Sequence, residues 1–184
     1  MTASSPDSRE GTRSVTERVL SFLNGLHQGG ARREHEARAV LGTAFDELLR
    51  TRMIKRGHGL LGPVITLDQA GFKALGQPPS FISATHATEQ VAWREAITLA
   101  IRRGYEVTSY TSTYLRLKNA QGQHVMYVRV SRNPPSAHAV AALIRYHRPS
   151  LRRDRGTLIV VVQDDQRFAY QQRRQPLLQV WTLQ

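Results

Sequence analysis

The acidic residues in the second half of this sequence are the side chains that could hold a catalytic metal ion. A metal-dependent nuclease brings at least two carboxylates together on Mg²⁺, which prefers hard oxygen ligands. Residues 107–117 and 125–131 have the composition of strands but contain neither Asp nor Glu. The acids outside them are dispersed along the chain: Glu89, Glu95, Glu106, Asp154, Asp164 and Asp165. This spacing predicts no metal site and no catalysis.

Cofactor sites are not indicated either. The chain has no cysteine, and its seven histidines are scattered rather than paired at the spacing of metal ligands. No glycine-rich loop stands between a strand and a helix, the position that a nucleotide-binding loop requires. We therefore expect no cofactor.

Arginines stand where acids would be needed for catalysis. In "HVMYVRVSR", residues 124–132, Arg129 and Arg132 follow apolar residues that are typical of a strand. In nucleases of similar layout, such positions carry the metal-binding carboxylates. Without a metal, these cations can bind phosphate directly or simply face solvent.

The densest basic cluster is "RYHRPSLRRDR", which contains Arg145, Arg148, Arg152, Arg153 and Arg155. We expect Pro149 to end a helix within it, so that the arginines spread from a loop. Like charges this close repel one another unless an anion is near. The cluster therefore favours a phosphate-contacting role over a merely solvated loop.

The composition also favours a polyanionic partner. The chain of 184 residues has 26 basic and 14 acidic residues, a net charge of +12, and three of the basic residues are lysines. Residues 1–80 hold 11 basic and 8 acidic residues, and residues 81–184 hold 15 and 6, so the second part is the more basic. Arginine suits phosphate and guanine edges, which indicates double-stranded DNA. The plainer alternative is an arginine-rich surface produced by a GC-rich genome.

No stretch approaches the ~20 apolar residues of a membrane span. The polar start "MTASSPDSREGTR" has no apolar signal core. These features predict a cytoplasmic protein without a membrane partner.

Residues 14–78 have the pattern of a winged helix-turn-helix, after a tail at 1–13 that we expect to be disordered. Ser14 and Glu17 form a capping box before a helix that ends near His27. A second helix fits 32–41, and a third begins with Thr43 as its cap. Residues 53–67 read as two strands around a glycine-rich turn, and 67–75 as a helix capped by Asp68.

In such a domain the third helix enters the major groove and the hairpin reaches the backbone or the minor groove. The residues expected to contact DNA lie at the start and end of that helix and on the hairpin: Thr43, Ala44, Glu47, Arg50, Arg52, Lys55, Arg56 and His58.

After a linker near residue 80, residues 84–184 predict a second domain. A helix over 88–103 would bury Val91, Ile97, Leu99, Ala100 and Ile101. Three strands in a meander follow, then a helix from about residue 136 to 146, then "GTLIVVV" as a strand buried on both faces. The order α-β-β-β-α-β predicts a small α/β sandwich with a mixed sheet, and the whole chain an α+β protein.

Two features together resemble the replication-relaxation family, whose members join a winged helix to a degenerate restriction-endonuclease-like domain. The first is "ITLDQAGFKAL", which is similar to the run that closes the wing in many winged-helix regulators. The second is the succession "THATEQVAWREAITLAIRRGYEV", "VMYVRVSR" and "LIRYHRPS", which follows the order of the family over residues 14–165. The family pattern tends to place an acid in the central strand, where this chain has Arg129 and Ser131. The resemblance implies a nuclease-like second domain, and this departure favours an inactive one.

The sequence thus predicts a non-catalytic DNA-binding protein, a regulator of transcription or of plasmid, phage or chromosome replication and maintenance. We expect a homodimer, because paired half-sites raise affinity. Two alternatives stay open: a metal-dependent DNA nuclease, and a protein-interaction or dimerisation module with weak affinity for DNA.

Overall fold

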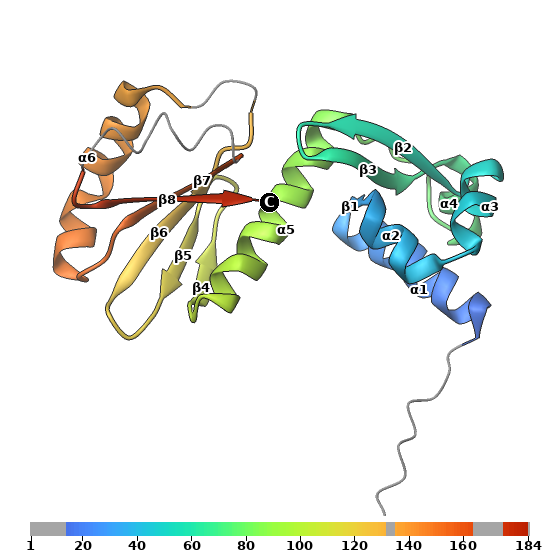
Figure 1. The fold of residues 1–184 in the computed structure, drawn as a ribbon, viewed down its shortest axis with the longest axis horizontal. Helices are drawn as coiled ribbons and strands as arrows, with labels where there is room; N and C mark the ends of the chain where they lie inside the picture. Colours follow the sequence, from blue (N-terminus) through green and yellow to red (C-terminus); the bar gives the residue numbers. More distant parts are fainter. Residues whose placement is uncertain (1–13, 132–134, 164–174, 184) are drawn as a thin grey trace, which may run out of the picture. The chain divides into compact units, whose positions relative to one another are not determined.

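The structure is a computed structural model that describes residues 14–131, 135–163 and 175–183. The expected tail at 1–13 and Arg132 lie outside these residues. The chain divides into two compact units. The first takes in the described residues up to Arg56 together with Ile65–Phe81, and the second takes in Gly57–Val64 and the described residues from Ile82 onward. The class is α+β, as predicted, with a three-stranded sheet in the order β1-β3-β2 and a five-stranded mixed sheet (Figure 1).

Helices and a hairpin form the first unit. Their order is α1 (Val15–Gly29), β1 (Arg32–Arg33), α2 (Glu34–Leu41), α3 (Ala44–Arg50), β2 (Ile54–Gly59), β3 (Gly62–Leu67) and α4 (Gln69–Ala74). Apolar side chains at helical spacing on α1 and α3 meet those of the hairpin, and Leu23, Phe45 and Ile65 are fully buried. One core therefore fixes α3 against the hairpin.

The ends of these helices agree only in part with the sequence. The capping box is confirmed, because the Ser14 hydroxyl accepts from the Glu17 amide and the Glu17 carboxylate accepts from the Ser14 amide. The two other predicted caps are not confirmed. Thr43 has helical backbone angles, and its side chain makes no capping hydrogen bond. The side chain of Asp68 makes no capping hydrogen bond either. The second helix begins at Glu34 rather than at Arg32, which belongs to β1.

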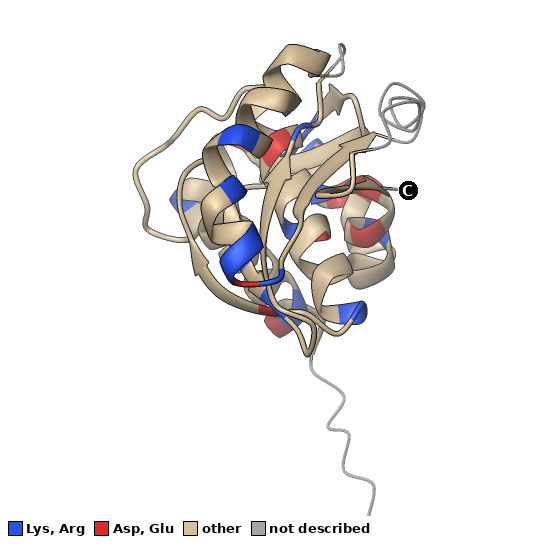
Figure 2. Cartoon of the chain, turned by 90° about the vertical axis from the view of Figure 1, so that its left-hand side faces the viewer, with Lys and Arg blue, Asp and Glu red and all other residues tan. Residues whose placement is uncertain are grey.

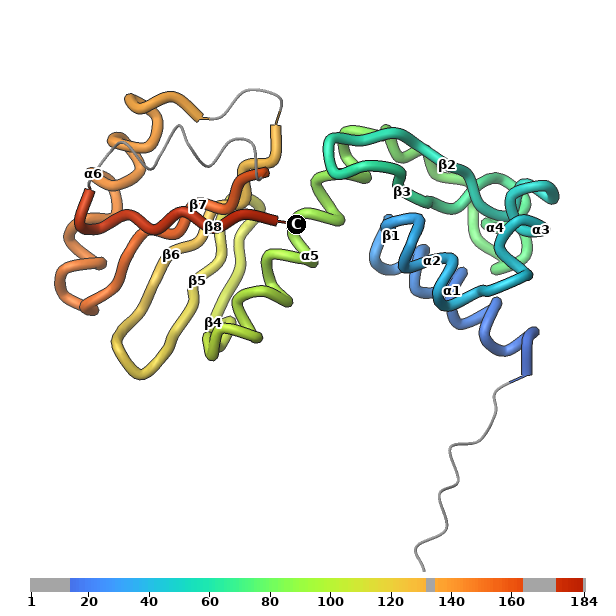
Figure 3. The backbone as a smooth tube through the Cα atoms, in the orientation of Figure 1, coloured from blue at the N-terminus to red at the C-terminus, as the bar shows by residue number. Residues whose placement is uncertain are grey.

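The second unit is a sheet with a helix on each face. Its elements are α5 (Ala84–Arg102), β4 (Glu106–Tyr110), β5 (Leu115–Lys118), β6 (Gln123–Val128), α6 (Ala137–Arg153), β7 (Leu158–Gln163) and β8 (Leu178–Leu183). The strand order is β4-β5-β6-β7-β8; the first two pairings are antiparallel and the last two are parallel. Figure 3 shows β6 and β7 side by side although α6 lies between them in the sequence.

Strand β7 is the most deeply buried strand of this unit. As predicted from its continuous apolar run, it is buried from Leu158 to Val162. Alternate side chains of the sheet, among them Val125 and Val160, pack against Ile144 of α6. Helix α5 covers the opposite face (Figure 1).

The face that α5 buries was predicted only in part: Val91 and Ala100 are buried as expected, and Ile97 and Leu99 are half-buried. The helix begins at Ala84, where the Ser83 hydroxyl accepts from the His86 amide, and not at Thr88. Its buried stripe is built mainly of alanines, including Ala92, Ala96 and Ala100, whereas Ile101 is exposed. Small side chains let a helix lie close to a sheet, so the largest apolar residues do not mark the inner face.

The prediction that the helix ends in a loop around Pro149 is also wrong. Helix α6 continues through Pro149 to Arg153, because His147 and Leu151 are buried on either side of the proline. Proline removes one backbone hydrogen bond near the end of the helix, and the burial of these two residues offsets that loss. The strand β8 was not included in the predicted order, and it extends the sheet to five strands.

The tip of the β2–β3 hairpin groups with the second unit, whereas the sequence placed all of it in the first domain. A Cβ on Gly59 would overlap the Thr88 hydroxyl of α5, so this approach needs glycine. The Gln163 side-chain amide donates to the backbone carbonyl of Leu60. The tip is therefore packed against α5 and the end of β7, which holds it in place.

Replacing Gly156 by Ala tests how closely the turn before β7 must approach β6. A Cβ at this position would overlap the backbone carbonyl of Gln123, so the free energy of unfolding should fall by about 2–3 kcal/mol. Gly29, at the end of α1, has open space around its Cβ direction, and Gly29→Ala is the matched control. Urea unfolding of both variants measures the difference; equal stabilities would contradict the close approach.

Candidate nucleic-acid interface

The helix expected to enter the major groove has an acidic outer face. Thr43 and Glu47 are exposed and Ala44 is half-buried. Arg50 at its end is bound by Glu47, with 2.7 Å between Nη2 and Oε1, and the Arg50 hydrogen bond lowers the pKa of Glu47. Asp46 adds a second carboxylate to this face. A phosphate at this helix would meet paired charges rather than free cations.

The hairpin cations also have partners. Arg56 lies 2.6 Å from Glu34, which Arg38 binds as well. Burial acts to raise the pKa of Glu34, but hydrogen bonds from Arg38 and Arg56 hold that pKa below its usual value. The Lys55 ammonium lies 4.7 Å from the centre of the Phe81 ring.

Arg52 and His58 complete the predicted set in this region. Arg52 binds Asp68, with 3.2 Å between Nε and Oδ2. His58 is exposed on the part of the hairpin that groups with the second unit. The structure thus pairs Arg50, Arg52 and Arg56 with carboxylates, which the sequence analysis did not predict. Glu34 and Arg56 are 22 residues apart, whereas the i,i+3 pair of Glu47 and Arg50 could have been found from the sequence.

The arginines of α6 are arranged differently. Arg145, Arg148 and Arg152 are exposed and follow one another at i, i+3 and i+7, which places them within about 60° of one another around the helix. None of the three has a carboxylate partner among the described residues. Figure 2 shows basic residues in blue following one another along this helix. We call these three residues the α6 arginine row.

Two further arginines lie at the end of α6. Arg153 binds Asp154 with 2.9 Å between Nε and Oδ1, and that hydrogen bond lowers the pKa of Asp154. Arg155 is exposed and has a left-handed backbone with φ of 51°. It occupies the position after the helix at which glycine is usual.

Arg129 lies directly after β6, half-buried, with its guanidinium 5.1 Å from the centre of the Tyr127 ring. It lines a hollow of about 230 Å³ together with Glu89, Trp93, Ser112 and Ser131. This hollow therefore combines one cation with one acid, and the α6 arginine row is not part of it.

An aromatic cluster lies between α6 and the sheet, and sequence-based reasoning did not identify it. Tyr114, Tyr127 and His147 have ring centres 5.3–5.8 Å apart. The Tyr127 hydroxyl and His147 Nε2 share a hydrogen bond of 2.9 Å. Tyr146 packs on His147 with ring centres 4.7 Å apart, yet 75% of Tyr146 is exposed. The residues come from separate segments, so their spacing along the chain does not reveal the cluster.

His124, a second buried histidine, connects the turn after β5 to the turn before β7. The Thr157 amide donates to Nδ1 of His124, so that nitrogen carries no proton. The proton is then on Nε2, which lies 3.0 Å from the acceptor Oδ1 of Asn119. Burial lowers the pKa of His124, and burial followed by the charge of Arg116 lowers that of His147. Both rings are neutral at physiological pH.

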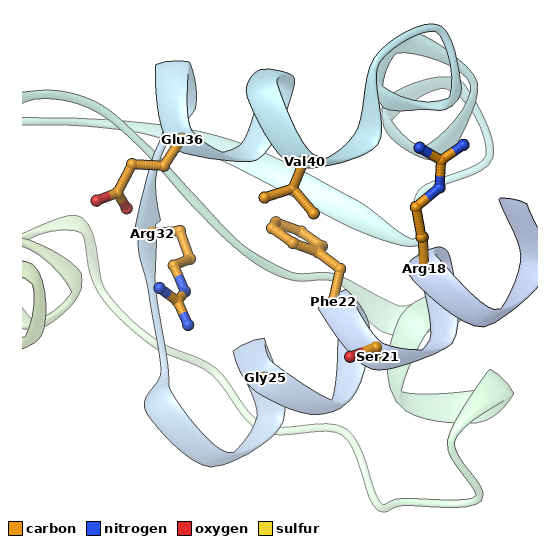
Figure 4. A pocket seen from close by; sticks show the side chains of 7 residues that line it. All are labelled: Arg18, Ser21, Phe22, Gly25, Arg32, Glu36 and Val40. Carbon is orange, nitrogen blue, oxygen red and sulfur yellow. The ribbon is translucent and has the colours of Figure 1, made fainter. Parts of the chain in front are cut away.

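A separate hollow lies between α1 and α2, with a volume of about 230 Å³. Figure 4 shows Phe22 and Val40 facing each other across it, with the guanidinium of Arg32 near Gly25 and Arg18 farther along α1. It is smaller than the 300–1,000 Å³ or so of typical ligand pockets. The hollow is lined by two cations, Arg18 and Arg32, but it is too small for a typical ligand pocket.

Within residues 14–131, 135–163 and 175–183, no three His, Asp or Glu side chains gather so as to hold a metal ion. Asp164 and Asp165 lie outside the described residues. Among the helices that the structure describes, none is long and apolar enough to cross a membrane.

No protein-family model, curated protein or solved structure matches the chain.

The two buried histidines predict a loss of stability in mild acid. Because their folded pKa values lie below the ordinary value of 6.5, the unfolded chain binds more protons. Their contribution is complete above about pH 6.5 and is lost as the pH falls below it. Urea unfolding between pH 7 and 5 should show this fall, and ring titration by NMR should show both pKa values below 6.5.

The variant His147→Gln should make the stability less dependent on pH in that range, whereas His35→Gln should not. A midpoint that stays constant for the unmodified chain from pH 7 to 5 would contradict the prediction. Loss of the ion pairs of Glu34 and Asp154 belongs to a separate, more acidic range, because their pKa values lie below those of ordinary carboxyls.

Proposed function

We propose that this protein is a non-catalytic DNA-binding regulator, acting in transcription or in the replication and maintenance of a plasmid, phage or chromosome. In this proposal α6 supplies the principal phosphate contacts. The observation that carries it is the α6 arginine row, three exposed cations on one helix face without a carboxylate partner among the described residues.

The distribution of charges favours α6 over α3 as the helix that contacts phosphates. Like charges on one helix face repel, and a phosphate chain relieves that repulsion while releasing counterions. At α3, the same phosphates would have to displace Glu47 from Arg50, which are bound to each other. The described residues of 82–183 include four acids against eleven lysines and arginines. The positive charge of the second unit is therefore largely uncompensated.

The first unit has a secondary part in the proposal. Its order of helices, hairpin and helix supports a winged helix-turn-helix, in which α3 and β2 approach the duplex. Arg50, Arg52 and Arg56 would then contact DNA only by exchanging carboxylates for phosphates. We further propose a homodimer, because two half-sites raise affinity and specificity.

The second unit supports the proposed nuclease-like layout without catalysis. Its order of helix, three strands, helix and strand is the predicted one, followed by β8. Arg129 occupies the end of the central strand β6, and no described acid lies on β5 or β6. A regulator with this layout would use the sheet as a scaffold for α6.

Replacing the three row arginines by Gln tests the proposed interface. The variant Arg145→Gln/Arg148→Gln/Arg152→Gln should bind random duplex DNA more weakly, with the slope of log affinity against log salt reduced by about one for each lost phosphate contact. Fluorescence anisotropy over a range of salt concentrations measures both quantities.

The matched control is Arg18→Gln/Lys73→Gln/Arg102→Gln, which removes the same charge from exposed positions outside α6. It should change the slope much less. Equal slopes for the two triple variants would mean that net charge, and not the α6 surface, determines binding. Little duplex affinity of the unmodified chain at ~150 mM salt would instead contradict the proposed function and favour a protein-interaction module.

The hairpin cations provide a second comparison. The variant Lys55→Ala/Arg56→Ala should also weaken duplex binding, but less than the row variant, because Glu34 already binds Arg56. A larger effect at the hairpin than at α6 would transfer the principal interface to the first unit.

A further inference from the structure

The aromatic cluster beside α6 holds one ring open to solvent. His147 is buried and is fixed by its hydrogen bond to the Tyr127 hydroxyl. Tyr146 packs against His147 at an interplanar angle of 86°, which orients its ring on a fixed neighbour. Since 75% of Tyr146 is exposed, this large aromatic surface is presented to the solvent instead of completing the core.

Two cations belong to the segments next to this ring, one on α6 and one on β5. Arg145 precedes Tyr146 on α6, and Arg116 lies on β5, where it is opposite Val125 of β6 and so on the α6 side of the sheet. The charge of Arg116 acts on His147 and on Asp154, which shows that it lies near the C-terminal part of α6. The residue one turn after Tyr146 on the same side is Pro149, which carries no charge.

Such a surface combines the two features that bind unpaired nucleotides. A positively charged surface follows the phosphate chain, and an exposed aromatic ring stacks on a base. A duplex hides the faces of its bases, so an aromatic ring adds little to duplex binding. Tyr146 lies about 100° from Arg145 around the axis of α6 and farther from Arg148 and Arg152, so its exposure is not explained by the phosphate contacts of the row.

We propose that Tyr146 is a stacking platform for an unpaired base and that the α6 surface, with Arg116, binds single-stranded nucleic acid. This inference rests on the proposed function, since it uses Arg145 of the α6 arginine row, together with Arg116, for the backbone of the strand. It adds the class of ligand: a strand with unpaired bases, DNA or RNA, of the kind exposed where a duplex is opened.

The test compares Tyr146→Leu with Tyr146→Phe in the full chain. Both substitutions are at an exposed position and retain an apolar side chain, but Phe keeps the aromatic face and Leu does not. The probes are oligo-dT and oligo-rU of about 15 nucleotides, which match typical site sizes, and a duplex of the same length. Tyr146→Leu should bind oligo-dT about tenfold more weakly, and Tyr146→Phe should bind within about twofold of the unmodified chain.

A second readout reports stacking directly. Oligo-dT with a central 2-aminopurine should lose fluorescence on binding the unmodified chain and the Phe variant, and should keep it with the Leu variant at saturating protein. Duplex affinity should be the same for all three proteins. The measurement with oligo-rU distinguishes DNA from RNA. A tenfold or greater preference for one probe would identify the strand as that nucleic acid. Similar affinities would mean that the surface contacts bases and phosphates without distinguishing the sugar.

Three outcomes would overturn the inference. Equal weakening by Leu and Phe would show that the hydroxyl, not the ring face, matters. Equal loss of duplex and single-strand affinity in Tyr146→Leu would show a general role in the surface. If the unmodified chain binds duplex but not oligo-dT, the inference fails while the proposed function stands; if it binds neither, both fail.

Discussion

Backbone pairing of β7 with parallel strands on both sides is the constraint on which the second unit depends. Five consecutive residues of this strand are buried, so its amides and carbonyls must be satisfied by β6 and β8. That pairing fixes the register of Tyr127 opposite Val160, and the face of the sheet that Tyr127 shares with α6. The positions of the aromatic cluster and of the α6 arginine row both follow from this arrangement.

The distribution of carboxylates then separates the two units. In the first, acids stand close to the cations of α3 and the hairpin, and surface pairs of this kind contribute only about 0–1 kcal/mol each to stability. Their larger effect is on the electrostatic surface, because a paired arginine attracts a phosphate less than a free one. In the second, Asp154 pairs with Arg153 and leaves the row on α6 uncompensated.

Sequence patterns predicted the parts of the fold that depend on local periodicity or on a single strong signal. The apolar run of β7 and the capping box at Ser14 are of this kind. The patterns failed where tertiary contacts decided the outcome: α6 passes through Pro149 because residues on both sides are buried, and α5 turns its alanines inward. The sequence identified the arginines of the candidate site, but it did not show that three of them lie on one face of a helix. The partners of Arg52 and Arg56, and the cluster around His147, could not be predicted because they join distant segments, whereas the i,i+3 pair of Glu47 and Arg50 is local and was overlooked.

The left-handed backbone at Arg155 has a consequence for engineering this protein. An L-residue other than glycine is strained in that conformation by roughly 1–2 kcal/mol. Arg52 adopts the same conformation but is tied to Asp68, whereas Arg155 has no such tie in the described part of the chain. A thermostabilising redesign guided by backbone preference alone would place glycine at Arg155, and would remove a cation from the rim of the basic surface. Higher thermal stability and the proposed contact with phosphate therefore place opposite demands on this residue.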